Sequence, residues 1–178
     1  MMNRILILAF LLCLAPLVPR AFALTMEKGS DAATRTIMDY IKDYVDIPPG
    51  ATDWKVFGKT KEINIEGKTK DGYDTQYYKP EFTPDLKALD GKEVTIKGYM
   101  FPLGPGEKQN LFLFGPFPVN CPFHYHVGPS LVIEVHADAD AVRFSYDPIV
   151  LKGKLELVPK DEENSTFYKL VDVKQIRS

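Results

Sequence analysis

The stretch Val94-Thr95-Ile96-Lys97-Gly98-Tyr99-Met100-Phe101 decides the predicted fold. Val94, Ile96, Gly98 and Met100 fall on one phase of a two-residue period, and the residues between them fall on the other. This alternation predicts a half-buried β-strand. A glycine inside such a strand permits sharp coiling or close backbone approach, which a small closed barrel requires.

The same two features recur along the chain. Leu151, Gly153, Leu155 and Leu157 alternate with charged residues, and Ile63 and Ile65 alternate with Glu62, Asn64 and Glu66. Further strands are expected at 110–114, 131–136, 141–146 and 166–173, and the connections at 102–107 and 161–165 are polar or rich in Gly and Pro. Short strands with this punctuation predict a mainly β chain that forms a small antiparallel OB-like barrel rather than a flat sandwich.

Two helices are expected outside the barrel. Ser30 or Asp31 can cap a helix that runs to about Val45, where Pro48-Pro49-Gly50 ends it. Its apolar stripe comprises Ile37, Met38, Ile41, Tyr44 and Val45, a spacing that favours packing on the main domain. Thr83 followed by Pro84 predicts a second, very short helix that reaches Leu89.

The first 23 residues have the features of a secretory signal peptide. Arg4 precedes the apolar run from Ile5 to Val18, and Ala21-Phe22-Ala23 forms a small-x-small cleavage site. The run is shorter than the roughly 20 residues of a membrane-spanning helix, although an uncleaved anchor stays an alternative. We therefore expect a periplasmic or secreted protein with no membrane span after cleavage, a helix and linker at 24–50, and an OB-like β domain at 51–178.

Charge argues against a nucleic-acid partner. Cleavage removes two arginines and leaves 20 basic residues against 24 acidic ones, a net charge of about −4. Acids and bases are interspersed, with no basic stripe that could follow a phosphate backbone. The mature chain is long enough for one domain with an adequate core.

Candidate chemistry is concentrated in Cys121-Pro122-Phe123-His124-Tyr125-His126. Cleavage removes Cys13, so Cys121 has no intrachain disulfide partner in an oxidising compartment. A thiolate with two imidazoles suits zinc, which we rank above copper, and leaves one coordination position open. Two alternatives stay open: an inert buried thiol, and histidines that are merely solvated.

Strand geometry supports Cys121, His124 and His126 as one metal-binding trio. In an extended segment the two histidines project from the same face, roughly 6 to 7 Å apart, and Pro122 favours a bend that can bring in the thiol. Possible additional ligands or hydrogen-bond partners of the ligands are His136 and Glu134, which share one strand face, and Met100, whose default role is to fill the core.

Several segments together resemble a known family. These are Leu89-Asp90-Gly91-Lys92, Gly98-Tyr99-Met100-Phe101-Pro102-Leu103, the Cys-x-x-His loop, and the strand from Val150 to Leu157. The chain resembles an uncharacterised family of exported bacterial proteins, a domain of unknown function that recurs beside components of metal-regulated ABC transport systems. The resemblance covers roughly residues 54–173 and implies a periplasmic accessory protein in metal handling. In many members a run of prolines follows the Cys-x-x-His, whereas this chain has Tyr125-His126-Val127-Gly128-Pro129.

Three functions are thus under consideration. The first is a transition-metal-binding accessory protein that presents its ion to an envelope transport or metal-handling partner. The second is an OB-like protein-interaction module without a metal, for which the first candidates are the aromatic residues Tyr73, Tyr77, Tyr78 and Phe82. The third is a hydrolase that uses Cys121 or a metal-bound water. Because no oxyanion-hole or phosphate-loop motif is present, we favour a binding protein over an enzyme.

Overall fold

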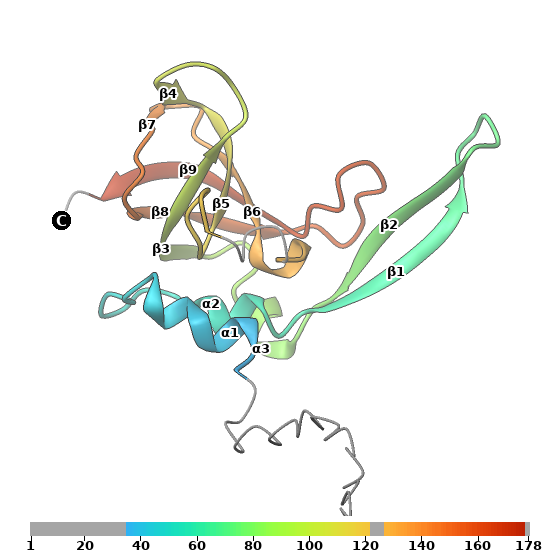
Figure 1. Ribbon diagram of the computed structural model, residues 1–178, viewed down its shortest axis with the longest axis horizontal. Coiled ribbons are helices and arrows are strands. Elements are labelled where there is room, and N and C mark those ends of the chain that lie inside the picture. Colours follow the sequence, from blue (N-terminus) through green and yellow to red (C-terminus); the bar gives the residue numbers. More distant parts are fainter. Residues whose placement is uncertain (1–34, 122–126, 177–178) are drawn as a thin grey trace, which may run out of the picture. The chain divides into compact units, whose positions relative to one another are not determined.

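The computed structural model describes residues 35–121 and 127–176 (Figure 1). The helical elements are α1 (Ile37–Tyr40), η1 (Ile41–Asp43), α2 (Trp54–Phe57), α3 (Pro84–Lys87) and η3 (Pro129–Leu131). The strands are β1 (Lys61–Lys68), β2 (Asp74–Glu81), β3 (Glu93–Pro102), β4 (Lys108–Gln109), β5 (Leu111–Gly115), β6 (Ile133–His136), β7 (Val142–Arg143), β8 (Ile149–Leu157) and β9 (Tyr168–Ile176). The signal peptide predicted at 1–23 lies outside the described residues.

Five of the described strands close into a barrel in the order β3-β5-β6-β9-β8, and β8 returns to pair with β3. This confirms the predicted mainly β, OB-like barrel. All pairings are antiparallel except one, since β6 and β9 run parallel where Glu134 meets Lys169 and Val135 meets Leu170. The parallel pair arises because the chain crosses from β6 through β7 to β8 before β9 returns beside β6.

The two glycines that the sequence predicts inside barrel strands, Gly98 and Gly153, stand where other chain segments come close. A Cβ at Gly98 would lie 2.6 Å from the carbonyl oxygen of Gly115, and one at Gly153 would lie 2.8 Å from that of Val171. Opposite Gly153 the register between β8 and β9 shifts, and Asp172 takes a left-handed φ of 54°. Such a bulge increases the local twist, so both glycines serve the coiling of the barrel.

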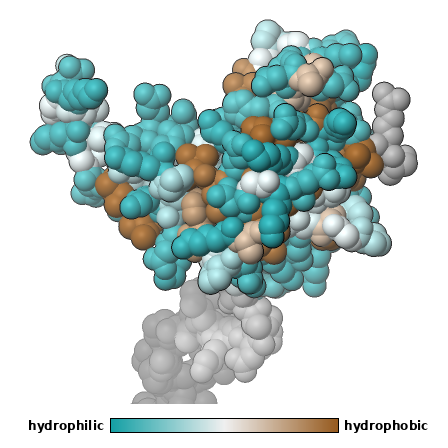
Figure 2. All heavy atoms as spheres, turned by 180° about the vertical axis from the view of Figure 1, so that it is seen from behind, coloured by the Kyte–Doolittle hydropathy of each residue, from teal (hydrophilic) through white to brown (hydrophobic). Residues whose placement is uncertain are grey.

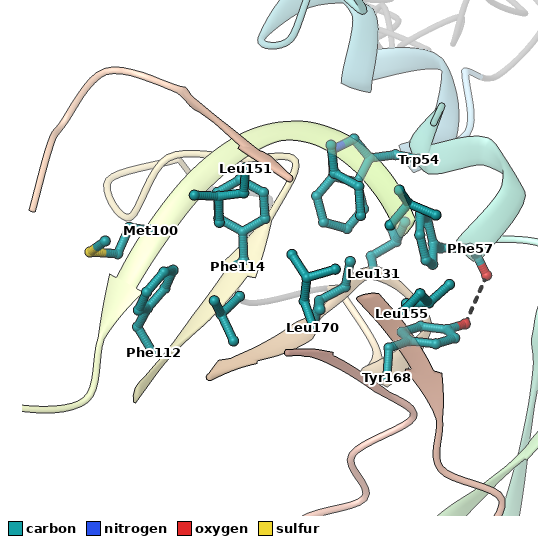
Figure 3. Packing of buried hydrophobic residues seen from close by; sticks show 14 of the residues in the cluster. Trp54, Phe57, Met100, Phe112, Phe114, Leu131, Leu151, Leu155, Tyr168 and Leu170 are labelled. Carbon is teal, nitrogen blue, oxygen red and sulfur yellow. Dashed lines mark hydrogen bonds between the residues drawn. The ribbon is translucent and has the colours of Figure 1, made fainter. Parts of the chain in front are cut away.

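Short helices and large side chains fill one end of the barrel. Trp54 and Phe57 of α2 are completely buried and pack with Phe114 and Tyr168 (Figure 3). Asp53 caps α2 by accepting a hydrogen bond from the Lys55 amide. The barrel core is therefore continuous with residues that precede it in the chain.

The N-terminal helix is shorter than the apolar stripe predicts. Its described part begins at Ile37, because Thr36 and Asp39 form a capping interaction in which the Thr36 amide donates to Asp39 at 2.8 Å. The chain then tightens into η1. Ile41 and Val45 are buried, which confirms that this helical segment packs on the main domain. The expected caps Ser30 and Asp31 lie outside the described residues.

Two of the predicted strands differ from expectation. The 141–146 strand is reduced to β7, which pairs only with the equally short β4. The alternation around Ile63 does form β1, but β1 pairs with β2 in a separate hairpin, and Ile63 is 40% exposed instead of half-buried. We call this hairpin, Lys61–Glu81, the arm. Figure 2 shows hydrophobic residues on the arm among hydrophilic ones.

A buried tyrosine links the barrel to α2. The Tyr168 hydroxyl lies 2.7 Å from the Thr60 hydroxyl and 3.1 Å from the carbonyl oxygen of Phe57, the bond drawn in Figure 3. Burial raises the pKa of Tyr168 above its ordinary value, so the hydroxyl stays protonated.

We expect Tyr168→Phe to lower the free energy of unfolding by about 1–3 kcal/mol, because it leaves buried polar groups without a partner. Urea denaturation followed by far-UV circular dichroism measures the loss. The matched control is Tyr146→Phe, since Tyr146 is 76% exposed and should tolerate the same change. Equal stabilities of the two variants would contradict the structural role of the hydroxyl.

Candidate functional site

Cys121 lies at the end of the segment that follows β5. Its amide donates to the Pro118 carbonyl at 2.9 Å, which closes a tight turn and fixes the residue. The side chain is 3% exposed and belongs to the hydrophobic core cluster. This burial suits both a metal ligand shielded from oxidants and the inert buried thiol that the sequence left open.

Two tyrosines interact with the Cys121 thiol, Tyr44 through a hydrogen bond and Tyr99 through electrostatics. The Tyr44 hydroxyl forms a hydrogen bond with Cys121, and this bond raises the pKa of Tyr44. Burial is the largest cause that raises the pKa of Tyr99, and the acidic groups of Asp147 and Cys121 add to it. Tyr99 also donates to the Tyr44 carbonyl at 2.9 Å. The thiol therefore has polar neighbours within an otherwise apolar setting.

The other two members of the predicted trio are His124 and His126. Both fall within residues 122–126, outside the described part of the chain. After this segment, Glu62 of β1 accepts a hydrogen bond from the Ser130 amide at 3.0 Å, and its carboxylate occupies the space that a Cβ at Gly128 would need. The chain is thus held in place on both sides of the histidine-containing segment.

The possible additional ligands lie elsewhere in the barrel. Met100 is 1% exposed and fills the core opposite Phe114 in register. Glu134 and His136 share one face of β6, where His136 Nε2 lies 2.6 Å from Glu134 Oε1. Within residues 35–121 and 127–176, no group of three or more His, Cys, Asp or Glu side chains could hold a metal ion. Glu134 and His136 therefore do not form a three-ligand site with Cys121.

Sequence reasoning did not identify three neighbours of the candidate residues. The sequence pattern places Tyr44 on the apolar stripe of a helix and Glu62 on the polar phase of a strand, and it assigns Lys169 to no site. Lys169 Nζ lies 3.3 Å from Glu134 Oε1. Each contact joins residues that are distant in sequence, so no local pattern signals it.

Among the described residues, no helix is long and apolar enough to cross a membrane.

In comparisons with known proteins, no family model matches this chain, and no curated protein or solved structure matches it either. Its own geometry defines the class of protein, an OB-like barrel that carries a two-stranded arm. The resemblance to exported proteins of metal-transport systems stays a prediction.

Proposed function

We propose that this protein is an exported accessory protein that binds a transition metal, zinc before copper, through Cys121, His124 and His126. The observation that carries the proposal is the fixed, buried thiol of Cys121 at the start of the histidine-containing segment. A lone thiol in an oxidising compartment is protected when it is buried and bound to a metal.

Chain length supports the trio without any assumption about conformation. Each residue adds at most about 3.6 Å, so the three residues that separate His124 from Cys121 in the sequence span at most roughly 11 Å. An imidazole can therefore reach an ion bound at the thiol. Three protein ligands leave one zinc position open, through which an envelope transport or metal-handling partner could accept the ion by ligand exchange.

Glu62 can supply a further oxygen next to this segment. Its Oε1 accepts from Ser130, and no described residue hydrogen-bonds to its Oε2. Gly128, against which this carboxylate packs, lies two residues after His126. A carboxylate in this position suits either the fourth coordination position or the outward N–H of a ligand imidazole.

Zinc titration of the mature protein, residues 24–178, tests the proposal. We expect wild-type protein to bind one equivalent, and Cys121→Ser and His124→Ala to weaken binding by at least about tenfold, since outer hydrogen-bond partners alone contribute that much. His136→Ala is the matched control, because His136 lies on β6 and should not change the affinity. Circular dichroism verifies that each variant is folded.

Unchanged stoichiometry and affinity in both Cys121→Ser and His124→Ala would refute the metal site. Slow reaction of Cys121 with iodoacetamide is no substitute test, because a thiol that is 3% exposed reacts slowly even without metal. Only a difference between zinc-loaded and chelator-treated protein reports on coordination.

A second candidate, the protein-interaction module, gains support from the arm. Tyr73 is 74% exposed and Tyr78 is 38% exposed, whereas Phe82 packs against Tyr168 in the core region. Exposed tyrosines on a hairpin outside the barrel suit contact with a partner protein. If the protein is an interaction module without a metal, Cys121→Ser and the wild type should show the same zinc affinity. The same titration therefore separates the two functions.

A further inference from the structure

A cavity of about 420 Å³ lies on the outside of the barrel, and Cys121 is not among its lining residues. Strands β5 and β6, the residue after β3, the segment before η3 and the β8–β9 loop form its walls. Its apolar lining is mostly aliphatic, with the side chains of Leu103, Leu113, Val127, Pro129 and Val132. The volume falls in the range of small-molecule sites, which pair apolar walls with a few fixed polar groups.

Glu134 supplies the carboxyl group of this cavity. Its side chain is 17% exposed, and both His136 and Lys169 contact the same oxygen, Oε1, at 2.6 and 3.3 Å. In the part of the chain that the structure describes, nothing hydrogen-bonds to Oε2. Two partners on one oxygen fix the carboxylate and leave the other oxygen available to a ligand.

The rim formed by the β8–β9 loop is held rigidly. Asp161 accepts hydrogen bonds from the amides of Glu163, Asn164 and Thr166, all at 3.1 Å. Ser165 has a left-handed φ of 55°, and its hydroxyl accepts from the Tyr78 amide at 2.9 Å. A non-glycine residue in this conformation is strained, and strain of this kind is concentrated at functional sites.

Asn164 adds a second hydrogen-bonding group at this rim. Its backbone amide is bound to Asp161, and its side-chain amide has no hydrogen-bond partner among the described residues. The cavity thus offers a carboxylate oxygen and an amide oxygen beside aliphatic walls.

We propose that this cavity binds an aliphatic primary amine, with the alkyl chain against Leu113 and Val132 and the ammonium group on Glu134. A fixed carboxylate oxygen without a partner favours a charged N–H donor, because charge-assisted hydrogen bonds are about twice as strong as neutral ones. No Lys or Arg is among the residues that line the cavity. Lys169 pairs with Oε1 from the neighbouring strand but does not line the cavity, so an anionic head group would meet the Glu134 carboxylate and no cation on the wall.

Three probes of equal chain length test the head group: hexylamine, 1-hexanol and hexanoate, each titrated by calorimetry into chelator-treated full-length mature protein. We expect hexylamine to bind about tenfold more tightly than either of the others, the difference that one charge-assisted hydrogen bond provides. Glu134→Gln should abolish this preference and keep the weaker, shared affinity. Glu156→Gln is the control, because Glu156 pairs with Lys154 outside the cavity.

Leu113→Ser should weaken all three probes alike, since it removes the shared apolar contact. Nα-acetyl-lysine amide distinguishes the source of the amine: binding as tight as that of hexylamine indicates a lysine side chain of a protein, and much weaker binding indicates a free amine. Equal affinities for the three head groups, or an amine preference that survives Glu134→Gln, would overturn the proposal. Because the protein is free of metal, this result does not depend on the zinc site.

Discussion

Gly98→Val should destabilise the barrel by about 3 kcal/mol or more, the upper end for overpacked cores. A Cβ at this position would lie 2.6 Å from the Gly115 carbonyl oxygen and 3.0 Å from both the Trp54 and Phe114 rings. The rings could shift only at the expense of other core contacts. The carbonyl belongs to the neighbouring strand β5 and cannot move without opening the pairing with β3.

Urea denaturation measures this loss, and Gly67→Val is the matched control. Gly67 also lies in a strand, but the nearest atom to its added Cβ is a Thr75 methyl group at 3.8 Å. The control should therefore change stability by no more than about 0.5 kcal/mol. Similar losses in the two variants would mean that the cost comes from valine in a strand and not from close approach in the barrel.

Trp54→Ala should cost about 3–5 kcal/mol, comparable with the whole stability of a small domain. The indole is completely buried, and its Nε1 donates to the Lys97 carbonyl at 2.7 Å. Truncation would open a cavity between α2 and Phe114 and leave that carbonyl without its donor (Figure 3). Both the cavity and the carbonyl without a donor would lie at the end of the barrel that α2 fills.

Trp54→Phe separates the loss of stability caused by the cavity from the loss caused by the missing hydrogen bond to Lys97. Phenylalanine keeps most of the packing but removes the N–H, so we expect an intermediate loss of about 1–3 kcal/mol. Far-UV circular dichroism is the appropriate signal, because the chain contains a single tryptophan. Tyr73→Ala controls for the loss of an aromatic ring at an exposed position. If Trp54→Ala were as mild as Tyr73→Ala, α2 would not be part of the barrel core.

Much of the barrel could be predicted from residue patterns. The alternation from Val94 to Phe101 indicates that one face of a strand is buried. The glycine within this strand indicates that another chain segment approaches the backbone closely. Both follow from the backbone period of two and the missing Cβ, which are local properties. The same alternation at Ile63 predicts a strand correctly but does not tell whether that strand enters the barrel or a separate two-stranded hairpin.

The candidate sites also combine residues that the sequence identifies with contacts that it does not reveal. Composition alone singles out Cys121, His124 and His126, because a thiol and imidazoles close together in sequence have a known preference for metals. No pattern connects Tyr44 with Cys121, or Glu62 with Gly128, since these pairs are separated by many residues. Lys169 reaches Glu134 only because β9 lies parallel to β6.

Strand content, the positions that need glycine and the residues with metal-binding chemistry can be predicted from local sequence, because they depend on each residue and its near neighbours. Four features emerge only in the folded chain: the pairing of the strands, the place of the arm outside the barrel, the burial of the Cys121 thiol beside Tyr44, and the cavity over Glu134. These features depend on which distant segments meet. Packing of the whole chain, with the loss of water from its core, settles that choice.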